Sequence, residues 1–403
     1  MCSDFPDGGR TAWTVLFGAW AVLFCSFGLV QSIGVFQEYY TRGPLRQYPS
    51  STIAWITSVE VWTQNFFGVP SGLLYDRFGP KWLMVGGSLL YVFGLMMTSL
   101  AEEYYQIFLA QSLVTSLGAS ACFNAAMSSV ATWFCRRRAL AFGIMMSGSS
   151  VSGMVLPVMV SQLSPKVGFP WAVRLIGFMA IALLSVSCVT VKSRIPPKPQ
   201  MIVFKRYVEG LREPIMALTI LAMFLFFWGM FVVFNYILLQ AQRQGVSPKL
   251  VDYLLPIMNG ASIFGRIIPT LIADKAGRLN MTILMSLLTS VFCLALWIPG
   301  KSDIAIIWFS IVFGFSTGGF VALAPALVAQ ISRIEEVGIR TGSSFAISSF
   351  GSLTGSPLAG VIVSASGGSF LGLQLFSGFT CLGATIALVV ARYLHVGWKM
   401  EKV

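Results

Sequence analysis

Two charged residues lie deep inside long apolar stretches of this sequence, and their types and positions are the first indication of chemistry. Arg266 precedes Asp274 by eight residues, so it would lie about 12 Å along a helix from the end of its stretch. Glu60 is the only carboxylate at such depth, about 12 Å from the opposite end of its own stretch. A charge inside hydrocarbon is costly unless it faces a wet cavity or a partner, so the position of Arg266 predicts a functional role and Glu60 is a candidate for one.

Each of these charges has a functional and a structural interpretation. The permanent charge and planar guanidinium of Arg266 suit a substrate carboxylate or polarised carbonyl, or a gating role, whereas the alternative is a purely structural interhelical hydrogen bond. Glu60 could bind and release a proton reversibly, whereas the alternative is a neutral carboxyl held by structural hydrogen bonds. Their depths differ by roughly two helical turns if the stretches are aligned, so we do not expect a direct ion pair.

The remaining reactive residue types exclude the common enzyme sites. The only histidine is His395, near the end of the chain, which excludes Ser-His-Asp and Cys-His catalysis and H-E-x-x-H metal sites. The seven cysteines include no C-x-x-C pair and no metal-ligand spacing, and they are best interpreted as small buried hydrophobes. We therefore expect no catalytic site, no metal and no cofactor.

The elements that must position these residues are membrane helices. The chain has 403 residues, of which 56% are hydrophobic and 10% are charged, whereas a soluble domain carries about 25% charged residues. Apolar runs of about 20 residues, the length that crosses a bilayer, occur twelve times. The predicted spans are 12–36, 52–74, 81–100, 106–134, 139–163, 171–191, 214–240, 250–272, 280–299, 304–331, 341–366 and 370–391.

The predicted spans divide into two sets of six. Residues 192–212, with three prolines and six basic residues, predict a cytoplasmic linker between an N-terminal bundle at 1–191 and a C-terminal bundle at 213–403. With both termini in the cytoplasm, 19 of the 27 Lys and Arg residues fall on the cytoplasmic side, 6 in outer loops and 2 within spans. The net charge of +12 therefore reflects membrane orientation, and we expect no nucleic-acid partner.

A charged turn after the second span recurs in the second half of the chain. Asp76 and Asp274 lie 198 positions apart, each in a turn between apolar runs, which predicts an internal repeat. Gly79 permits a sharp reversal of the chain. An aspartate here could accept hydrogen bonds from a neighbouring helix N-terminus and latch the halves together, whereas the alternative is an ordinary solvated turn. The predicted gating residues are Gly72, Asp76, Arg77, Gly79, Lys81, Asp274 and Arg278.

The first turn resembles the loop signature of the major facilitator superfamily. Residues 72–81 match the pattern G-x-L-x-D-R-x-G-x-R/K at every defined position. This resemblance implies an all-α polytopic membrane protein with twelve transmembrane helices in two pseudo-symmetric six-helix bundles. It also implies a central site that opens alternately to either side of the membrane.

Nearly the whole chain also resembles the fungal branch of the monocarboxylate porter family. The similar segments are 6–13, 133–143 and 261–266. Proton-coupled lactate carriers of that family have a lysine where this chain has Gln31 and an aspartate where it has Ser262, although their arginine is retained as Arg266. The resemblance therefore implies the fold and a transport function, whereas the lactate mechanism does not carry over.

By analogy with this family, polar side chains from several spans are expected to bind the substrate. Besides Arg266, the candidates are Gln31, Asn124, Asn235, Tyr236, Asn259, Ser316 and Thr317. Tyr236 belongs to an aromatic run in the seventh span, and such runs more often contact lipid or core than a ligand.

The sequence as a whole predicts a secondary active transporter for an organic anion or a largely apolar natural product, such as a secondary metabolite, with or without proton coupling. Its partners would be that small molecule, protons and the lipid bilayer, and it would act as a monomer in the plasma membrane. Import and export fit the sequence equally well. The alternatives are a transport-dead sensor or receptor of the same fold and, third, an integral-membrane enzyme, for which the chain lacks a metal or nucleophile constellation.

Overall fold

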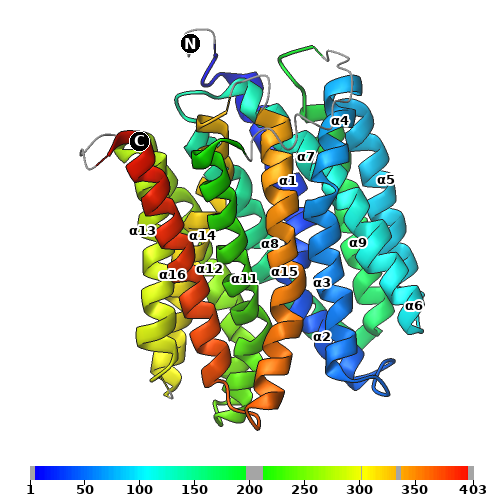
Figure 1. Cartoon of the computed structure of the whole chain (residues 1–403). Helices are drawn as coiled ribbons and strands as arrows, with labels where there is room; N and C mark the ends of the chain where they lie inside the picture. The colour runs from blue at the N-terminus through cyan, green and yellow to red at the C-terminus, as the bar shows by residue number, and fades with distance from the viewer. Residues whose placement is uncertain (1–4, 197–211, 301, 333–336, 398–403) are drawn as a thin grey trace.

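The computed structural model describes residues 5–196, 212–300, 302–332 and 337–397, and all regular elements in these ranges are helical (Figure 1). The elements of the first half are α1 (Arg10–Gln31), α2 (Ile33–Arg42), α3 (Ser50–Phe66), α4 (Gly68–Phe78), α5 (Pro80–Thr98), α6 (Tyr104–Ile107), the π-helix η1 (Phe108–Thr115), α7 (Ser116–Trp133), α8 (Arg138–Val167) and α9 (Phe169–Thr190). Those of the second half are α11 (Pro214–Arg243), α12 (Pro248–Ala276), α13 (Arg278–Phe292), the π-helix η3 (Cys293–Trp297), α14 (Asp303–Gln330), α15 (Val337–Ala365) and α16 (Leu371–Val396).

Eleven helices of the described chain are long and apolar enough to cross a membrane, and a pair of shorter helices covers the remaining predicted span. This pair is α3 and α4, which are separated at Phe67. Pro70 explains the interruption, because it has no N–H to donate to the carbonyl of Phe66. The first predicted span is also interrupted, at Ser32 between α1 and α2. The predicted all-α polytopic fold is confirmed, although two of its spans are broken helices.

The fourth span runs without a break over Tyr104–Trp133 but widens into the π-helix η1 near its start. A capping box begins it, in which Oε1 of Gln106 accepts the backbone N–H of Glu103 at 3.2 Å. A π-helical turn holds one residue more than an α-helical turn, which changes the direction of the side chains that follow. Gln111, inside η1, lies against α3 and donates a hydrogen bond to Glu60.

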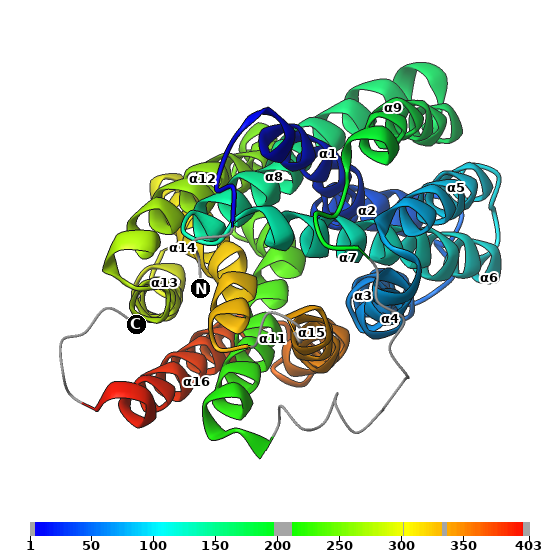
Figure 2. The same cartoon turned by 90° about the horizontal axis from the view of Figure 1, so that it is seen from above.

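The helices form two groups that meet along two seams. Figure 2 shows α1 to α9 on one side of the molecule and α11 to α16 on the other. The first seam, where α8 packs against α12, is called the α8–α12 seam below; the second, where α3 and α4 pack against α15, is called the α3–α15 seam. Helix α1 begins and α16 ends at the same end of the molecule (Figure 1). Most of the predicted linker, residues 197–211, lies outside the described residues.

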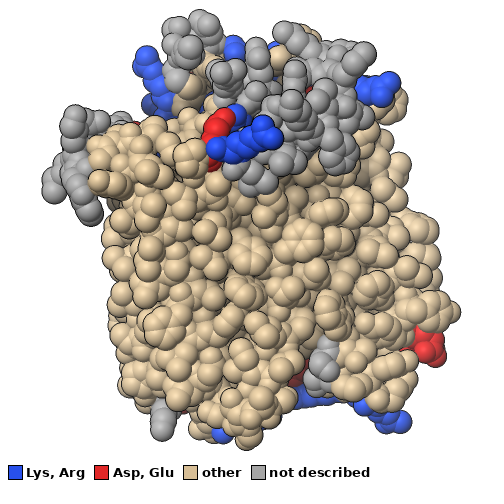
Figure 3. Space-filling view, in the orientation of Figure 1, with Lys and Arg blue, Asp and Glu red and all other residues tan. Residues whose placement is uncertain are grey.

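The surface of the bundle has an uncharged belt. Figure 3 shows Lys, Arg, Asp and Glu gathered at the two ends of the visible face, with other residue types between them. Large apolar side chains point outward from the helices, including Leu89, which is 68% exposed, and Val361, which is 63% exposed. Exposed apolar side chains in a belt of this kind are stable against lipid tails. The belt therefore supports a protein that crosses the membrane many times.

Candidate functional site

A cavity between the two halves is called the arginine pocket below, and among the described residues Arg266 is the only charged one that lines it. Five of the sixteen lining side chains are phenylalanine and two are methionine, so the wall is mainly apolar. The pocket is lined by Phe27, Val30, Gln31, Asn65, Met146, Ser149, Phe227, Met230, Phe231, Phe234, Ser262, Arg266, Thr317, Gly318, Val321 and Phe345. Both halves contribute, because α1, α3 and α8 face α11, α12, α14 and α15 across the cavity.

The guanidinium of Arg266 connects the two halves beside this pocket. The residue is only 3% exposed, and its Nη1 donates hydrogen bonds to the carbonyl oxygen of Met146 and to Oγ of Ser149, both on α8. Its Nε donates to Oγ of Ser262 at 3.2 Å, one turn earlier on α12. Within the described ranges Nη2 has no acceptor and no acidic side chain pairs with the guanidinium. Arg266 therefore has an interhelical role and retains donor capacity at the pocket wall.

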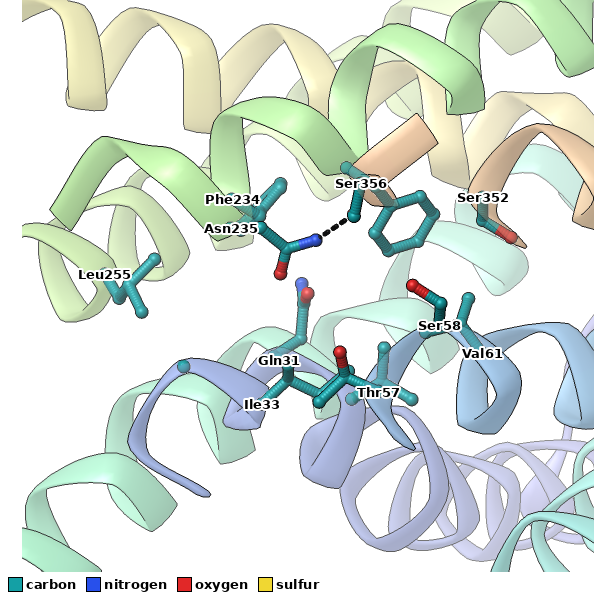
Figure 4. A pocket seen from close by; sticks show the side chains of 13 residues that line it. Gln31, Ile33, Thr57, Ser58, Val61, Phe234, Asn235, Leu255, Ser352 and Ser356 are labelled. Carbon is teal, nitrogen blue, oxygen red and sulfur yellow. Dashed lines mark hydrogen bonds between the residues drawn. The ribbon is translucent and has the colours of Figure 1, made fainter. Parts of the chain in front are cut away.

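Figure 4 shows a second cavity, called the amide pocket below. The two share the side chains of Val30, Gln31, Phe231 and Phe234. The amide pocket has no charged lining residue, but six of its thirteen lining residues carry polar side chains. It is lined by Val30, Gln31, Ile33, Gly34, Thr57, Ser58, Val61, Phe231, Phe234, Asn235, Leu255, Ser352 and Ser356.

Four of the substrate-binding candidates line these pockets: Arg266 and Thr317 line the arginine pocket, Asn235 lines the amide pocket, and Gln31 lines both. Gln31 is held by Asn259, whose Oδ1 accepts from Nε2 of Gln31 at 3.2 Å. Asn259 thus lines neither pocket but holds the side chain of Gln31, which lines both.

The other three candidates lie outside both pockets. Ser316 accepts a hydrogen bond from Oγ1 of Thr289 on α13 at 2.9 Å. Asn124 donates to the carbonyl of Ser120 on its own helix at 2.8 Å. Tyr236 donates its hydroxyl hydrogen to the carbonyl of Ser356 at 3.1 Å and so supports the amide pocket from outside.

Several residues of the pocket walls were not singled out from the sequence. The polar ones are Thr57, Ser58, Asn65, Ser149, Ser352 and Ser356. Serine and threonine are common in membrane helices, where their hydroxyls often bond to a carbonyl of the preceding turn. A signal was nevertheless present around Ser58, because α3 carries six polar side chains between positions 57 and 65.

Glu60 lies in the interior of the first half and lines neither pocket. It is 1% exposed, and its Oε2 accepts a hydrogen bond from Nε2 of Gln111 at 2.7 Å. Oε1 of Gln111 in turn accepts the hydroxyl hydrogen of Tyr40 at 2.6 Å. The carboxyl group therefore ends a short buried hydrogen-bond chain that joins α2, η1 and α3.

The two charged turns differ in their contacts. Oδ2 of Asp274 accepts the backbone N–H of Leu140 in the first turn of α8 at 3.2 Å, and Oδ1 pairs with Arg278 at 3.1 Å. Arg278 also donates to the carbonyl of Cys135 across the seam at 3.3 Å. Asp76 makes no hydrogen bond or ion pair with any described residue. Both turns reverse at a glycine with positive φ, 74° at Gly79 and 103° at Gly277, which side chains other than glycine rarely adopt.

The gating residues beside Asp76 lie at the end of α4 and the start of α5. The guanidinium of Arg77 lies 5.3 Å from the centroid of the Phe78 ring. Lys81 is exposed in the first turn of α5, and Gly72 is buried. These positions are those of a turn at the surface of the bundle.

The chemistry that this arrangement supports is reversible binding. Within the described ranges, no three His, Cys, Asp or Glu side chains come together as a metal site would require. The two pockets offer one cation, three amides, several hydroxyls and a large apolar surface. Such a lining holds and orients a ligand by charge, hydrogen bonds and shape.

Comparison with known proteins places the chain in a family. The sequence profile of the Major Facilitator Superfamily matches residues 10–307. An MFS transporter of Aspergillus flavus is 44% identical over 399 residues, which cover 98% of this chain and 90% of the relative. The fujikurins efflux protein of Gibberella fujikuroi is 39% identical over 398 residues, which cover 98% of this chain and 86% of the relative.

A solved structure supports the same assignment at the level of the fold. The fucose:proton symporter of E. coli superposes with a TM-score of 0.72 at 15% sequence identity, over 95% of this chain and 99% of that chain. The family match, the similar fungal proteins and the membrane helices agree with each other. The chain belongs to the Major Facilitator Superfamily and is a multi-pass membrane transporter.

Proposed function

We propose that this transporter exports an amphipathic organic acid of the secondary-metabolite class, which it binds in the arginine pocket. The observation that carries the proposal is a single buried cation, Arg266, in a wall of phenylalanine and methionine side chains. The relative from Gibberella fujikuroi, which is named for fujikurins efflux, supports export as the direction. The pocket lies between the halves, so rocking of one half against the other would expose it to each side in turn.

The composition of the pocket wall favours a ligand with both an acidic and an apolar part. The acceptors that Arg266 contacts, Met146, Ser149 and Ser262, are neutral. An anionic ligand would supply the missing opposite charge in a setting where an unpaired charge is costly. Phenylalanine rings offer large apolar faces, and methionine side chains adapt to irregular shapes. A small hydrophilic anion would leave these faces unused.

The proposal is tested by counterflow of labelled amphipathic organic acids into proteoliposomes. Arg266→Ala removes the charge and the planar fork, and it should weaken binding about 100-fold. Arg266→Lys keeps the charge, so a loss of only about 10-fold is expected if charge dominates over fork geometry. Arg174→Lys is the matched control, because Arg174 bonds to Ser99, lies over Trp171 and lines neither pocket. Unchanged affinity in both Arg266 variants, with normal expression, would leave Arg266 a structural role only.

Glu60 is the proposed proton site of this transporter. Its carboxyl is buried, and within the described ranges it forms no salt bridge. Protonation would remove a charge that burial penalises, so a proton could be carried there and released. Gln111 and Tyr40 would orient the carboxyl as the proton moves.

Glu60→Gln should abolish the dependence of transport on a pH gradient while leaving counterflow intact, because glutamine keeps the shape and cannot titrate. Glu38→Gln is the matched control, since Glu38 is 43% exposed and paired with Arg42 on α2. Initial rates in proteoliposomes with and without an imposed pH gradient measure the effect. A Glu60→Gln variant that still follows the gradient rules this role out.

The proposed setting is a monomer in the plasma membrane with both termini in the cytoplasm. The excess of Lys and Arg predicted for the side of the termini supports this orientation. A C-terminal epitope tag should then react with antibody only after the cells are permeabilised. Labelling of intact cells would overturn the orientation.

A further inference from the structure

The amide pocket differs in kind from the arginine pocket that it adjoins. No charged side chain lines it, whereas Arg266 lines its neighbour. The pockets share four lining side chains, including Gln31 and Phe231, so a ligand that spans both would have to pass these side chains. A ligand group in the amide pocket therefore meets hydrogen-bonding side chains without a counter-charge, which suits a neutral group.

Backbone carbonyls determine which way the Gln31 amide faces. Nδ2 of Asn259 donates to the carbonyl of Leu255 at 3.1 Å and to that of Gly153 at 3.5 Å. A carbonyl oxygen only accepts, so these contacts require the NH₂ group of Asn259 at that position and leave its Oδ1 facing Gln31. Gln31 must then donate through Nε2, as it does at 3.2 Å. Its Oε1 has no donor among the described residues and remains an acceptor at the wall shared by the two pockets.

Asn235 presents a second amide oxygen on the opposite wall. Its Nδ2 donates one hydrogen to Oγ of Ser356, and its Oδ1 accepts no hydrogen bond from a described residue and can accept one from a ligand. Figure 4 shows the amide groups of Gln31 and Asn235 pointing toward one another from α1 and α11. Two carbonyl oxygens thus converge on one space, and neither accepts a hydrogen bond from a described residue.

The hydroxyls of the pocket add to this excess of acceptors. Thr57 donates its single hydroxyl hydrogen to the carbonyl of Ala54 at 3.0 Å, and Ser352 donates to Ser349 at 2.8 Å. Each of these hydroxyls can now only accept. Ser58 is 4% exposed, and its Oγ has no partner among the described residues. This hydroxyl can therefore form a hydrogen bond with a ligand or with water.

We infer that the amide pocket binds a neutral hydrogen-bond donor, a hydroxyl or an amide N–H, at the end of the substrate remote from its acidic group. This inference rests on the proposed function, in which the acidic group binds Arg266. It narrows the substrate class to amphipathic acids with an apolar middle and a donor at the far end. An ether or ester oxygen at that end has no hydrogen to donate, so it would leave the amide oxygens of Gln31 and Asn235 unpaired and would bind less tightly.

The test compares three matched families of probes on the purified full-length transporter by isothermal titration calorimetry. They are phenylalkanoates of increasing chain length, their para-hydroxy derivatives and their para-methoxy derivatives. At the chain length that reaches from Arg266 into the amide pocket, the hydroxy probe should bind at least about 5-fold more tightly than the methoxy probe. The methoxy probe fills the same space but has no hydrogen to donate, so the difference isolates the donor.

Two variants link this preference to the pocket. Asn235→Leu and Thr57→Val each remove an acceptor at nearly constant volume, and each should reduce the hydroxy preference. Thr63→Val is the matched control on α3, because Thr63 is buried and lines neither pocket, so it should keep the preference. Unchanged affinity for the unsubstituted phenylalkanoate shows that a variant is folded.

The outcomes separate this inference from the proposed function. Equal binding of hydroxy and methoxy probes at every chain length, or a preference that survives both variants, overturns the donor site. If Arg266→Ala leaves the affinity for all three families unchanged while the hydroxy preference persists, the acid-binding role fails and the donor site stands. Absence of binding by any probe overturns both.

Discussion

Along the α8–α12 seam, hydrogen bonds cross between the halves at intervals of one or two helical turns, whereas none crosses between α3 or α4 and α15 in the described chain. The crossing pairs of the first seam are Asn259 with Gly153, Ser262 with Ser150, Arg266 with Met146 and Ser149, and Asp274 with Leu140. Beyond its end, Arg278 at the start of α13 bonds to Cys135, just before α8. The α3–α15 seam is instead held by aromatic contacts, in which the rings of Trp62 and Phe66 lie 6.0 and 5.8 Å from that of Phe350.

The two helices of the α3–α15 seam also carry buried polar atoms that lack partners among the described residues. They are Oγ of Ser58, Nε1 of Trp62, Oγ1 of Thr63, Nε2 of Gln64 and Oδ1 of Asn65 on α3, and Oγ1 of Thr341 on α15. A buried polar group without a hydrogen bond costs about 1–3 kcal/mol, and this cost disappears when water reaches it. Opening the α3–α15 seam would relieve this cost, whereas opening the α8–α12 seam breaks bonds already made.

This difference suggests a division of roles between the seams. Hydrogen bonds are directional, so the α8–α12 seam has one preferred register, whereas apolar contacts tolerate small displacements. We hypothesise that the α8–α12 seam sets the free energy of opening and that the α3–α15 seam adapts to it. Matched substitutions in the two seams test this hypothesis in three ways.

The largest effect is expected from adding one methyl group to each seam. A Cβ at Gly143 on α8 would overlap the backbone oxygen of Arg266 and Oγ1 of Thr270, so Gly143→Ala must force the seam apart. A Cβ at Gly342 on α15 would lie 3.3 Å from the backbone oxygen of Gly68, a tight contact that needs only a small shift.

We expect Gly143→Ala to reduce transport at least about 10-fold and Gly342→Ala to retain most of it, because overpacking costs about 1–3 kcal/mol where the backbone cannot yield. Initial transport rates, normalised to the amount of inserted protein, measure both. Equal losses in the two variants would contradict the proposed difference between the seams.

An intermediate effect is expected from the two aspartates of the repeated turns. Asp274→Asn removes the negative charge at the N-terminus of α8 and the ion pair with Arg278, contacts worth up to about 2 kcal/mol. The sequence repeat predicts that Asp76→Asn also slows turnover. Because Asp76 has no partner within the described ranges, we expect its effect to be smaller than that of Asp274→Asn. Spin-label distances between the helix ends at each turn would report opening. A larger response to Asp76→Asn than to Asp274→Asn would reverse the comparison.

The smallest effect is expected from single hydroxyls. Thr341→Val removes an unpartnered buried hydroxyl at constant volume, so it should leave thermal stability unchanged or raise it by about 1 kcal/mol. Ser262→Ala leaves Ser150 and Nε of Arg266 without a partner, so it should lower stability by about 1 kcal/mol. Thermal unfolding of both variants in the same detergent compares them. A destabilised Thr341→Val would show that its hydroxyl has a partner, such as a bound water.

Much of the architecture could be predicted without the structure, because it depends on local properties of the chain. Apolar runs of the length of a bilayer predicted the membrane helices, and the pattern around Gly79 and Asp76 predicted the family and its repeat. The depth of Arg266 along its helix predicted a buried charge between apolar neighbours, since helical rise is nearly constant. Broken spans were harder to predict, since one proline, Pro70, interrupts α3 and α4 while Pro157 stays inside α8.

Only the tertiary structure decided which polar side chains meet. Gln31 and Asn259 are 228 positions apart, and their hydrogen bond depends on how α1 and α12 are rotated against each other. The orientation of α14 turns Ser316 toward α13, while Thr317, the next residue, lines the arginine pocket. Neighbouring residues on a helix point about 100° apart, so hydropathy alone cannot say which of them faces a cavity. The sequence by itself therefore determined the helices, the repeat and the depth of Arg266, and the packing of the two halves determined the pockets.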